Sequence, residues 1–429
     1  MTIWKFIYNM FFVPLMWCIF HLGGMINGKI KRGIHGRTDL FDTLQRGAAL
    51  LRGTHRVWFH ASSMGEFEQA KPIISVLKKK YQHVDIIATF FSPSGYDHSR
   101  NYKLADIISY IPFDSAANAE RFIEIIRPTV AVMVRYDIWP NMVWVLQEKK
   151  IPVMIANATM EEKSARLLPL IKSFHTSLYN SFSHILTVSE RDKKAFQRFG
   201  TTHPVIEAIG DTRFDQVLMR SNEAATKVLL PQHITNGKKI FIVGQSWEED
   251  EEVILPVLFK LQKIEHDLLT IIVPHEPTID HLETLEYQLE THTSCIRFSL
   301  INNYNQEKVI LVDSIGILVA LYKYASLVYV GGSFQQGVHN VLEPAIFSNP
   351  VLFGPKHTNS QEAVELAKRR GAFIIDNERD LYRILRSLLD NYEERMFAGA
   401  IAEDFVRKNC GATVRFLTYI EPFLSNVTP

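Results

Sequence analysis

Glu66 has the position of a catalytic carboxylate. In HASSMGE (residues 60–66) it follows an apolar run and a turn of small residues, at the start of a predicted helix. A helix dipole would keep a carboxylate there ionised, so Glu66 could act as a general base towards a hydroxyl. Ser63 stands three residues earlier, which is the spacing of a capping box, so Glu66 could equally be a structural cap. Spacing alone leaves the two interpretations even.

The stretch 327–355 predicts a nucleotide site. A short apolar strand at 327–330 breaks into Gly331-Gly332-Ser333, and Asn340 is then expected to open a helix with Glu343 in its first turn. Free backbone N–H groups in such a loop suit a phosphate, and Glu343 could accept hydrogen bonds from a ribose diol. A tight turn without a ligand is the alternative, and the carboxylate favours the nucleotide.

Other expected strand ends also carry polar residues. DIWPN (137–141) could merely end a strand and start a helix, or it could hold an acceptor sugar. The acidic run 248–252 is expected to be the solvated first turn of a helix and not a metal site, because no D-x-D pair follows a strand end. His275 could contact a base or be a structural histidine.

Apolar runs without polar alternation are separated by helical stretches, which is typical of parallel sheets covered on both faces. The first series lies at 57–60, 85–91, 107–110, 129–134, 153–156 and 184–188, and the second at 240–243, 269–273, 309–312, 327–330 and 351–353. We therefore expect an α/β protein with two Rossmann-like, doubly wound domains. Their ligands should lie at the carboxyl ends of the strands, in a cleft between the domains.

Composition supports two domains. A chain of 429 residues can hold two cores, and its net charge of +1 gives no general reason to expect nucleic acid. The predicted domains are 38–215 and 239–405, joined by a polar, irregular linker at 216–238. A last helix within 406–429 should pack across both domains. The three cysteines show no pairing or metal-ligand spacing, which fits a reducing compartment.

Residues 1–37 have the pattern of a membrane anchor. An apolar, aromatic run from 4 to 26 is followed by Lys29, Lys31, Arg32 and Arg37. The basic block follows the apolar run and no A-x-A-like site separates them, which argues against a signal peptide. The segment could span the membrane or lie in its interface. Its deletion is expected to release the protein from membranes and leave the fold intact.

These motifs carry a family resemblance. HASSMGE, DIWPN, GDTRFD (210–215) and GGSFQQGVHNVLEPAIFSNPVLFGP (331–355), in this order behind an anchor, resemble the 3-deoxy-D-manno-octulosonic acid (Kdo) transferases. Members of this family move Kdo from CMP-Kdo onto lipid A precursor. The resemblance extends to about residue 375. It implies the GT-B arrangement of two Rossmann-like domains, no metal or other cofactor, and a position on the cytoplasmic face of the inner membrane.

The resemblance also implies roles for residues. Glu66 would be the catalytic base of an inverting transfer. Residues 38–215 would bind the acceptor and 239–405 the donor, while Arg213 would hold the Kdo carboxylate. The expected donor-binding residues are Arg213, Ser246, His275, Gly331, Gly332, Ser333, Asn340 and Glu343, and the expected acceptor-binding residues are Ser63, Gly65, Asp137, Trp139 and Asn141.

Two other functions stay open from the residues. One is a GT-B enzyme with a UDP-sugar donor, either a transferase or an epimerase. The other is a membrane-tethered binding protein without catalysis, against which the retention of Glu66, Asn340 and Glu343 argues.

Overall fold

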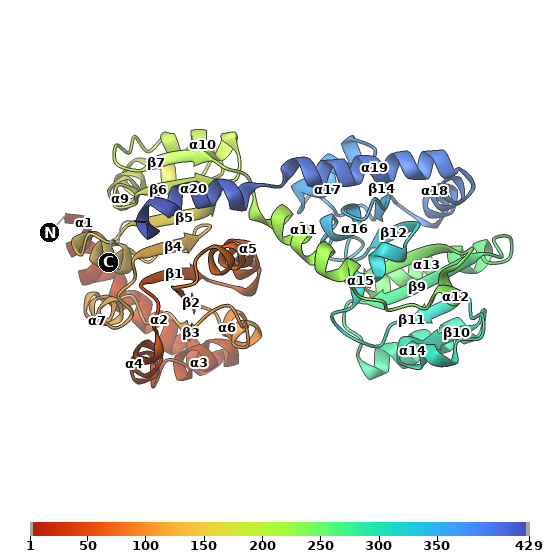
Figure 1. Ribbon diagram of the computed structural model, residues 1–429, viewed down its shortest axis with the longest axis horizontal. Coiled ribbons are helices and arrows are strands. Elements are labelled where there is room, and N and C mark those ends of the chain that lie inside the picture. The colour runs from red at the N-terminus through yellow and green to blue at the C-terminus, as the bar shows by residue number, and fades with distance from the viewer. Residues whose placement is uncertain (1–2, 426–429) are drawn as a thin grey trace. The chain divides into compact units, whose positions relative to one another are not determined.

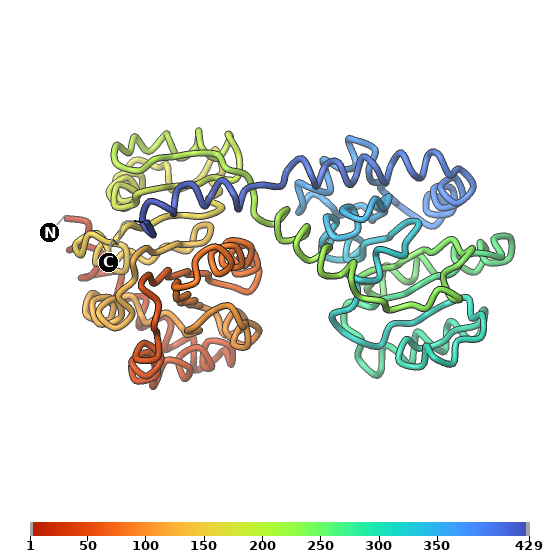
Figure 2. The backbone as a smooth tube through the Cα atoms, in the orientation of Figure 1, coloured from red at the N-terminus to blue at the C-terminus, as the bar shows by residue number. Residues whose placement is uncertain are grey.

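The computed structural model describes residues 3–425, and the chain divides into two compact units (Figure 1). Unit 1 contains the residues up to Gln216 and those from Cys410 onward, and unit 2 is Val217–Asn409. Figure 2 follows the backbone from unit 1 into unit 2 and back into unit 1 with its last helix. The predicted ranges 1–37 and 406–429 include residues 1–2 and 426–429, which lie outside the described residues.

Unit 1 is built on a parallel sheet whose order, within the described residues, is β3-β2-β1-β4-β5-β6-β7. The strand order reverses between β1 and β4, as in a doubly wound fold. The strands are β1 His55–Ala61, β2 Val84–Phe90, β3 Ile107–Tyr110, β4 Val130–Val134, β5 Val153–Ala158, β6 His184–Thr187 and β7 Val205–Ala208.

Helices cover both faces of this sheet, so its central strands are mainly apolar. One face packs against α4 (Leu40–Leu50), α7 (Ala116–Ile126), α8 (Pro140–Glu148), α9 (Pro169–Tyr179) and α10 (Glu190–Gln197). The other face packs against α5 (Met64–Lys80) and α20 (Ala412–Leu424). The short helix α6 (Pro93–Ser99) follows β2.

Unit 2 repeats the plan, with the order β10-β11-β9-β8-β12-β13-β14 among the described residues and a reversal between β8 and β12. Its strands are β8 Lys239–Ser246, β9 Leu268–Pro274, β10 Cys295–Arg297, β11 Val309–Leu311, β12 Leu327–Val330, β13 Val351–Phe353 and β14 Ala372–Ile374. Its helices are α13 Glu248–Leu261, α14 Ile279–Glu290, α15 Leu318–Leu321, α16 Leu342–Ala345, α17 Gln361–Lys368, α18 Glu378–Asp390 and α19 Tyr392–Asn409. The predicted pair of parallel α/β domains is confirmed.

Two predicted connections are wrong. The expected irregular linker contains α11 (Thr212–Ala225), which carries the chain from unit 1 into unit 2, and α12 (Gln232–Thr235). The expected single C-terminal helix is two helices, α19 in unit 2 and α20 in unit 1. The break falls at Gly411, whose φ of +100° favours glycine.

The N-terminal segment is helical from Ile3 to Ile26, through α1 (Ile3–Ile7), a π-helical turn (Tyr8–Phe12) and α2 (Val13–Ile26). It is long and apolar enough to cross a membrane. A second, basic helix, α3 (Gly28–His35), follows. The structure contradicts the idea of a separable anchor, because Tyr8 is buried in the unit 1 core. The deletion expected to be harmless would open that core.

Candidate active site

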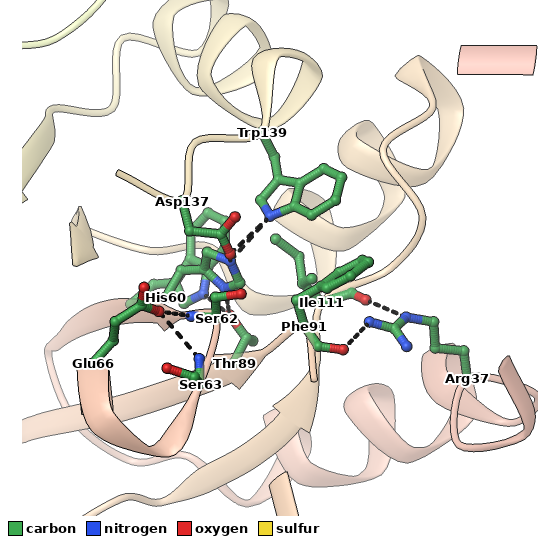
Figure 3. A network of polar contacts seen from close by, with 11 residues as sticks. Arg37, His60, Ser62, Ser63, Glu66, Thr89, Phe91, Ile111, Asp137 and Trp139 are labelled. Atoms are coloured by element: carbon green, nitrogen blue, oxygen red, sulfur yellow. Dashed lines mark hydrogen bonds and ion pairs between the residues drawn. The ribbon is translucent and has the colours of Figure 1, made fainter. Parts of the chain in front are cut away.

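Glu66 lies in the first turn of α5, directly after β1 and beside the point where the strand order reverses (Figure 3). Its Oε2 atom accepts hydrogen bonds from the backbone N–H groups of Ser62 (2.5 Å) and Ser63 (3.1 Å). The predicted cap is therefore present. Both bonds go to the same oxygen, so capping leaves Oε1 outside these contacts. The two interpretations of Glu66 are compatible.

The carboxyl group of Glu66 is buried, with 6% of the residue exposed. Burial, and after it the negative charge of Asp137, raise the pKa of Glu66, against the opposing effect of its two backbone hydrogen bonds. The helix start was expected to favour the ionised form of Glu66. Burial and the charge of Asp137 oppose that effect, and ionisation of Glu66 at neutral pH stays a prediction.

Asp137 follows β4, on the other side of the reversal, and it pairs with His60 of β1. The Nε2 atom of His60 lies 2.8 Å from Asp137 Oδ2, and the imidazole is fully buried. Burial acts to raise the pKa of Asp137, but the hydrogen bonds from His60 and from the Trp139 indole N–H outweigh it and lower the pKa. Asp137 is thus held as a fixed negative charge.

A second layer fixes the ring of His60. Its Nδ1 atom lies 2.9 Å from Thr89 Oγ1, which also accepts the indole N–H of Trp58 at 2.8 Å. An ionised carboxylate can only accept hydrogen bonds, so His60 carries a proton on Nε2 and donates it to Asp137. Trp139 Nε1 lies 3.3 Å from Asp137 Oδ2, and its N–H donates there, since Nε2 of His60 is already protonated.

This arrangement gives the neighbouring carboxyl groups of Glu66 and Asp137 different acidities. The pKa of Glu66 is raised and that of Asp137 is lowered, each by its own surroundings. Such a pair is typical of sites that move protons near neutral pH, with one group exchanging a proton and the other supplying constant charge. Glu66 is the group suited to accept a proton.

The other unit 1 candidates separate into accessible and buried residues. Ser63 and Trp139 are half-buried beside this pair, and an added Cβ on Gly65 would meet nothing within 4 Å. Asn141 is fully buried, and its amide nitrogen donates to the Asp114 carbonyl (2.7 Å) and to Asn9 Oδ1 (3.0 Å). We therefore treat Asn141 as a structural residue.

In unit 2, the glycine loop meets the end of β8 too closely to accept side chains. A Cβ on Gly331 would lie 2.1 Å from the carbonyl oxygen of Gln245, and Gly332 has a φ of +92°. The expected free N–H groups are absent at these two glycines. Gly331 N–H donates to the Gly244 carbonyl at 2.9 Å, and Gly332 N–H donates to Asp250 at 2.7 Å.

Asp250 was not predicted as a site residue. It was expected to lie in a solvated helical turn, but it is fully buried and accepts hydrogen bonds from Gly332 N–H, Trp247 N–H (3.0 Å) and the Tyr329 hydroxyl (2.7 Å). Burial is the largest effect and raises the pKa of Asp250. This carboxyl group organises the loop and occupies the N–H group that a phosphate was expected to use.

Three aromatic rings stack at the carboxyl ends of β8, β9 and β12. The ring of His275 stacks on those of Trp247 (centroids 4.6 Å apart) and His339 (4.4 Å), and Trp247 Nε1 donates to His339 Nε2 at 3.0 Å. Burial, followed by the proximity of His275, lowers the pKa of His339 to about 4. The imidazole of His339 is therefore neutral at pH 7, which suits contact with a flat, uncharged base. Trp247 and His339 were not predicted.

The remaining donor candidates differ in their contacts. The hydroxyl groups of Ser246 and Ser333 are buried, the first donating to Glu251 and the second accepting from Gly354 N–H. Asn340 does not start a helix, because α16 begins at Leu342, but its Oδ1 accepts the Leu342 N–H at 3.1 Å.

Glu343 lies in α16 and pairs with Arg220 NH1 at 3.3 Å. Arg213 lies in unit 1, where its guanidinium contacts Asp211 at 2.8 Å and its side chain is 40% exposed. The expected contacts of Glu343 and Arg213 with the donor stay predictions.

Several known proteins are similar to this chain. Residues 35–216 match the family model described as 3-deoxy-D-manno-octulosonic-acid transferase (Kdo transferase). The 3-deoxy-D-manno-octulosonic acid transferase of Haemophilus influenzae is 27% identical over 98% of this chain and 99% of its own length. The transferase of the same name from Chlamydophila psittaci is 26% identical over 85% of each chain.

Solved structures support the fold. UDP-GlcNAc 2-epimerase from Neisseria meningitidis, solved with UDP-GlcNAc, has a TM-score of 0.58 at 14% identity and covers 86% of this chain and 100% of its own. The UDP-GlcNAc 2-epimerase of Methanocaldococcus jannaschii has a TM-score of 0.53 at 17% identity, over 85% and 99%. These likenesses show a GT-B-like pair of α/β domains. By its match to the family model over residues 35–216 and to full-length relatives, the chain is similar to the Kdo transferases, which are glycosyltransferases.

Proposed function

We propose that the enzyme transfers Kdo from CMP-Kdo to the lipid A precursor lipid IVA, in the biosynthesis of the lipopolysaccharide core. Configuration at the anomeric carbon would be inverted, with Glu66 as the general base. The observation that carries the mechanism is the Glu66–Asp137 pair, whose pKa values are shifted in opposite directions at the strand-order reversal of unit 1. The similarity to Kdo transferases is the reason for proposing Kdo as the sugar and CMP-Kdo as the donor.

In this mechanism unit 1 binds the acceptor. Glu66 Oε1, which lies outside the cap, takes the proton of an acceptor hydroxyl while the hydroxyl oxygen attacks the anomeric carbon of Kdo. The bond from that carbon to the phosphate oxygen breaks, and CMP departs with the bonding electrons. Asp137 stays ionised through its contact with His60, so its charge favours protonation of Glu66 as the transfer proceeds. Ser63, Gly65 and Trp139 border the same place and are the proposed acceptor contacts.

Unit 2 binds the donor in the proposal. The stack of Trp247, His275 and His339 offers a flat face to the cytosine base, and Glu343 accepts hydrogen bonds from the ribose hydroxyl groups. The phosphate cannot use the N–H groups of Gly331 and Gly332, which are already donated within the loop. We assign phosphate contact to the amide Nδ2 of Asn340, because its Oδ1 is held by Leu342 N–H.

The lipid acceptor places the enzyme at the cytoplasmic face of the inner membrane. The exposed side chains of Lys29, Lys31 and Arg32 on α3 can meet acceptor phosphates. Arg37 cannot take this role, because its guanidinium donates to the carbonyl groups of Ile111 and Phe91 within unit 1 (Figure 3).

The direct test is transfer by the purified full chain. CMP-Kdo and lipid IVA are the substrates, mass spectrometry is the readout, and UDP-GlcNAc in place of CMP-Kdo is the control donor. A Kdo-bearing lipid formed only with CMP-Kdo supports the proposal. Calorimetric titration should show CMP binding more tightly than UDP. Tighter UDP binding, with no Kdo transfer, would point to a UDP-sugar enzyme of the same fold.

A further inference from the structure

The apolar N-terminal helix, Ile3–Ile26, lies along unit 1 over its whole length. Near its start, Trp4 Nε1 donates to Ser173 at 3.3 Å. Near its end, the ring of Phe20 packs on those of Phe113 and Phe91, with centroids 5.1 and 5.6 Å apart. The helix is thus fixed at both ends to the surface of the domain.

Three polar side chains of this helix face the domain, and the Nδ1 atom of His21 lies 2.8 Å from the Trp17 carbonyl oxygen of the helix itself. Tyr8 donates to Asp114 at 2.9 Å, and the amide groups of Asn9 and Asn141 exchange hydrogen bonds at 2.9 and 3.0 Å. Lys5, whose side chain is 15% exposed, lies 2.5 Å from Glu148. Because of these contacts, the polar groups of Lys5, Tyr8 and Asn9 do not lie on the outer face, where contact with lipid would be unfavourable.

The outward face of the helix is apolar. Among residues 3–26, each exposed position carries an apolar side chain or the thiol of Cys18. Phe6, Met10, Leu22 and Ile26 are all more than half exposed, with Ile26 at 91%. A continuous apolar face of this length is not typical of surfaces in contact with water.

Basic charge borders this apolar face. Asn27 caps α3, accepting hydrogen bonds from the N–H groups of Lys29 and Ile30, and α3 packs back on α2, where Ile34 approaches Gly24. Lys29, Lys31 and Arg32 are exposed on α3. An apolar face beside exposed lysine and arginine matches the boundary between acyl chains and anionic headgroups.

We infer that this helix lies in the plane of the membrane, at the anionic headgroup boundary, and does not span the bilayer. If it crossed the bilayer alone, Lys5, Tyr8 and Asn9 would lose their partners and face lipid. If it crossed while still bound to unit 1, Glu148 and the surface around it would enter the hydrocarbon. In-plane binding keeps the polar contacts and buries only the apolar face. The inference rests on the membrane location proposed with the function.

Depth measurements test the orientation. All variants are full chains that carry Cys295→Ser and Cys410→Ser. One variant carries the fluorophore at Cys18. The other two carry Cys18→Ser and place the fluorophore at Phe6→Cys or at Leu22→Cys. Quenching by brominated lipids at several depths is then measured in phosphatidylethanolamine–phosphatidylglycerol vesicles. Positions 6 and 22, which are sixteen residues apart, would differ in depth by about 24 Å along a perpendicular helix. In-plane binding predicts similar, shallow depths at the three sites.

Two results would overturn the inference. One is a progression of depth from Phe6→Cys to Leu22→Cys, which indicates a spanning helix. The other is weak quenching at every site together with cross-linking of Cys18 between chains, which assigns the apolar face to a second copy. No donor or acceptor is present in these vesicles, so either result leaves the proposed Kdo transfer to be judged by its own assay.

Discussion

The buried imidazole of His60 lies 2.8 Å from the carboxylate of Asp137, and this contact links the end of β1 to the loop after β4. Through it, Asp137 remains ionised although it is partly buried. The nearby Glu66 experiences the resulting negative charge and binds its proton more tightly. The acidity of the proposed base therefore depends on a histidine that does not itself contact Glu66 in the hydrogen-bond network.

The pH profile of transfer should report this coupling. Glu66 acts as a base only when ionised, and its pKa is raised, so activity should fall on acidification at a pH above the usual glutamate value of about 4.3. Asp137→Asn removes the negative charge and should shift the acidic limb of kcat to lower pH. Asp42→Asn, in an exposed turn of α4, is the matched control and should leave the limb in place. An unshifted limb in Asp137→Asn would contradict the coupling.

Glu343→Gln should weaken CMP binding. Loss of a charged acceptor for the ribose hydroxyl groups should cost about 1–3 kcal/mol, measured by calorimetry. Glu365→Gln, at a partly exposed position in α17 of the same unit, should bind CMP normally. The melting temperatures of both variants are measured as well, because loss of the Arg220 contact would lower stability whereas loss of a ribose contact would lower only CMP affinity. Unchanged CMP affinity in Glu343→Gln would remove this residue from the donor site.

Asn141 should act on stability. Asn141→Leu removes hydrogen bonds to Asn9 and Asp114 and leaves buried polar groups without partners, at a cost of about 1–3 kcal/mol. Each kcal/mol of lost stability lowers the melting temperature of a domain of this size by about 2–4 °C, so the melting temperature of unit 1 should fall measurably. CMP affinity should not change, since the proposed donor site is in unit 2. A normal melting transition with a raised KM for the acceptor would restore the predicted acceptor role.

Metal independence also stays a prediction. CMP carries one phosphate, and neutral and cationic side chains can balance its charge. Transfer should therefore continue in EDTA at its normal rate. Loss of activity that returns on addition of magnesium would refute this part of the mechanism.

Sequence patterns predicted the central strands of both sheets, because strands buried on both faces consist of continuous apolar residues. The strands missed were β7, β10 and β14, all at sheet edges. Val205 of β7 is exposed, for example, and the strand has no fully buried residue. An edge strand needs only one paired side, so its sequence carries a weaker signal.

The sequence predicted only part of the candidate site, because the other features depend on how distant residues pack together. Strand ends located Glu66 and Asp137 near the reversal, but the direction of the Glu66 pKa shift depends on burial and on a neighbour 71 positions away in sequence. Asp250 stands in a run of five acidic residues, and only the contacts of Tyr329 and Gly332 show that this one is buried against the glycine loop. Asn141 was assigned to the acceptor because the sequence could not show that Asn9 covers it.

The central claim, that Glu66 is the base of Kdo transfer, is tested most directly by single-turnover rates of Glu66→Gln with CMP-Kdo and lipid IVA. The glutamine can still accept the N–H bonds of Ser62 and Ser63, so melting temperature and CMP affinity should change little. Ser115→Ala, which removes the side-chain cap of α7 in the same unit and leaves Glu66 unchanged, is the control. We predict a rate about 10²–10⁴ times lower in Glu66→Gln and a nearly normal rate in Ser115→Ala. A nearly normal rate in Glu66→Gln, accompanied by a loss of stability, would show that Glu66 is only a cap.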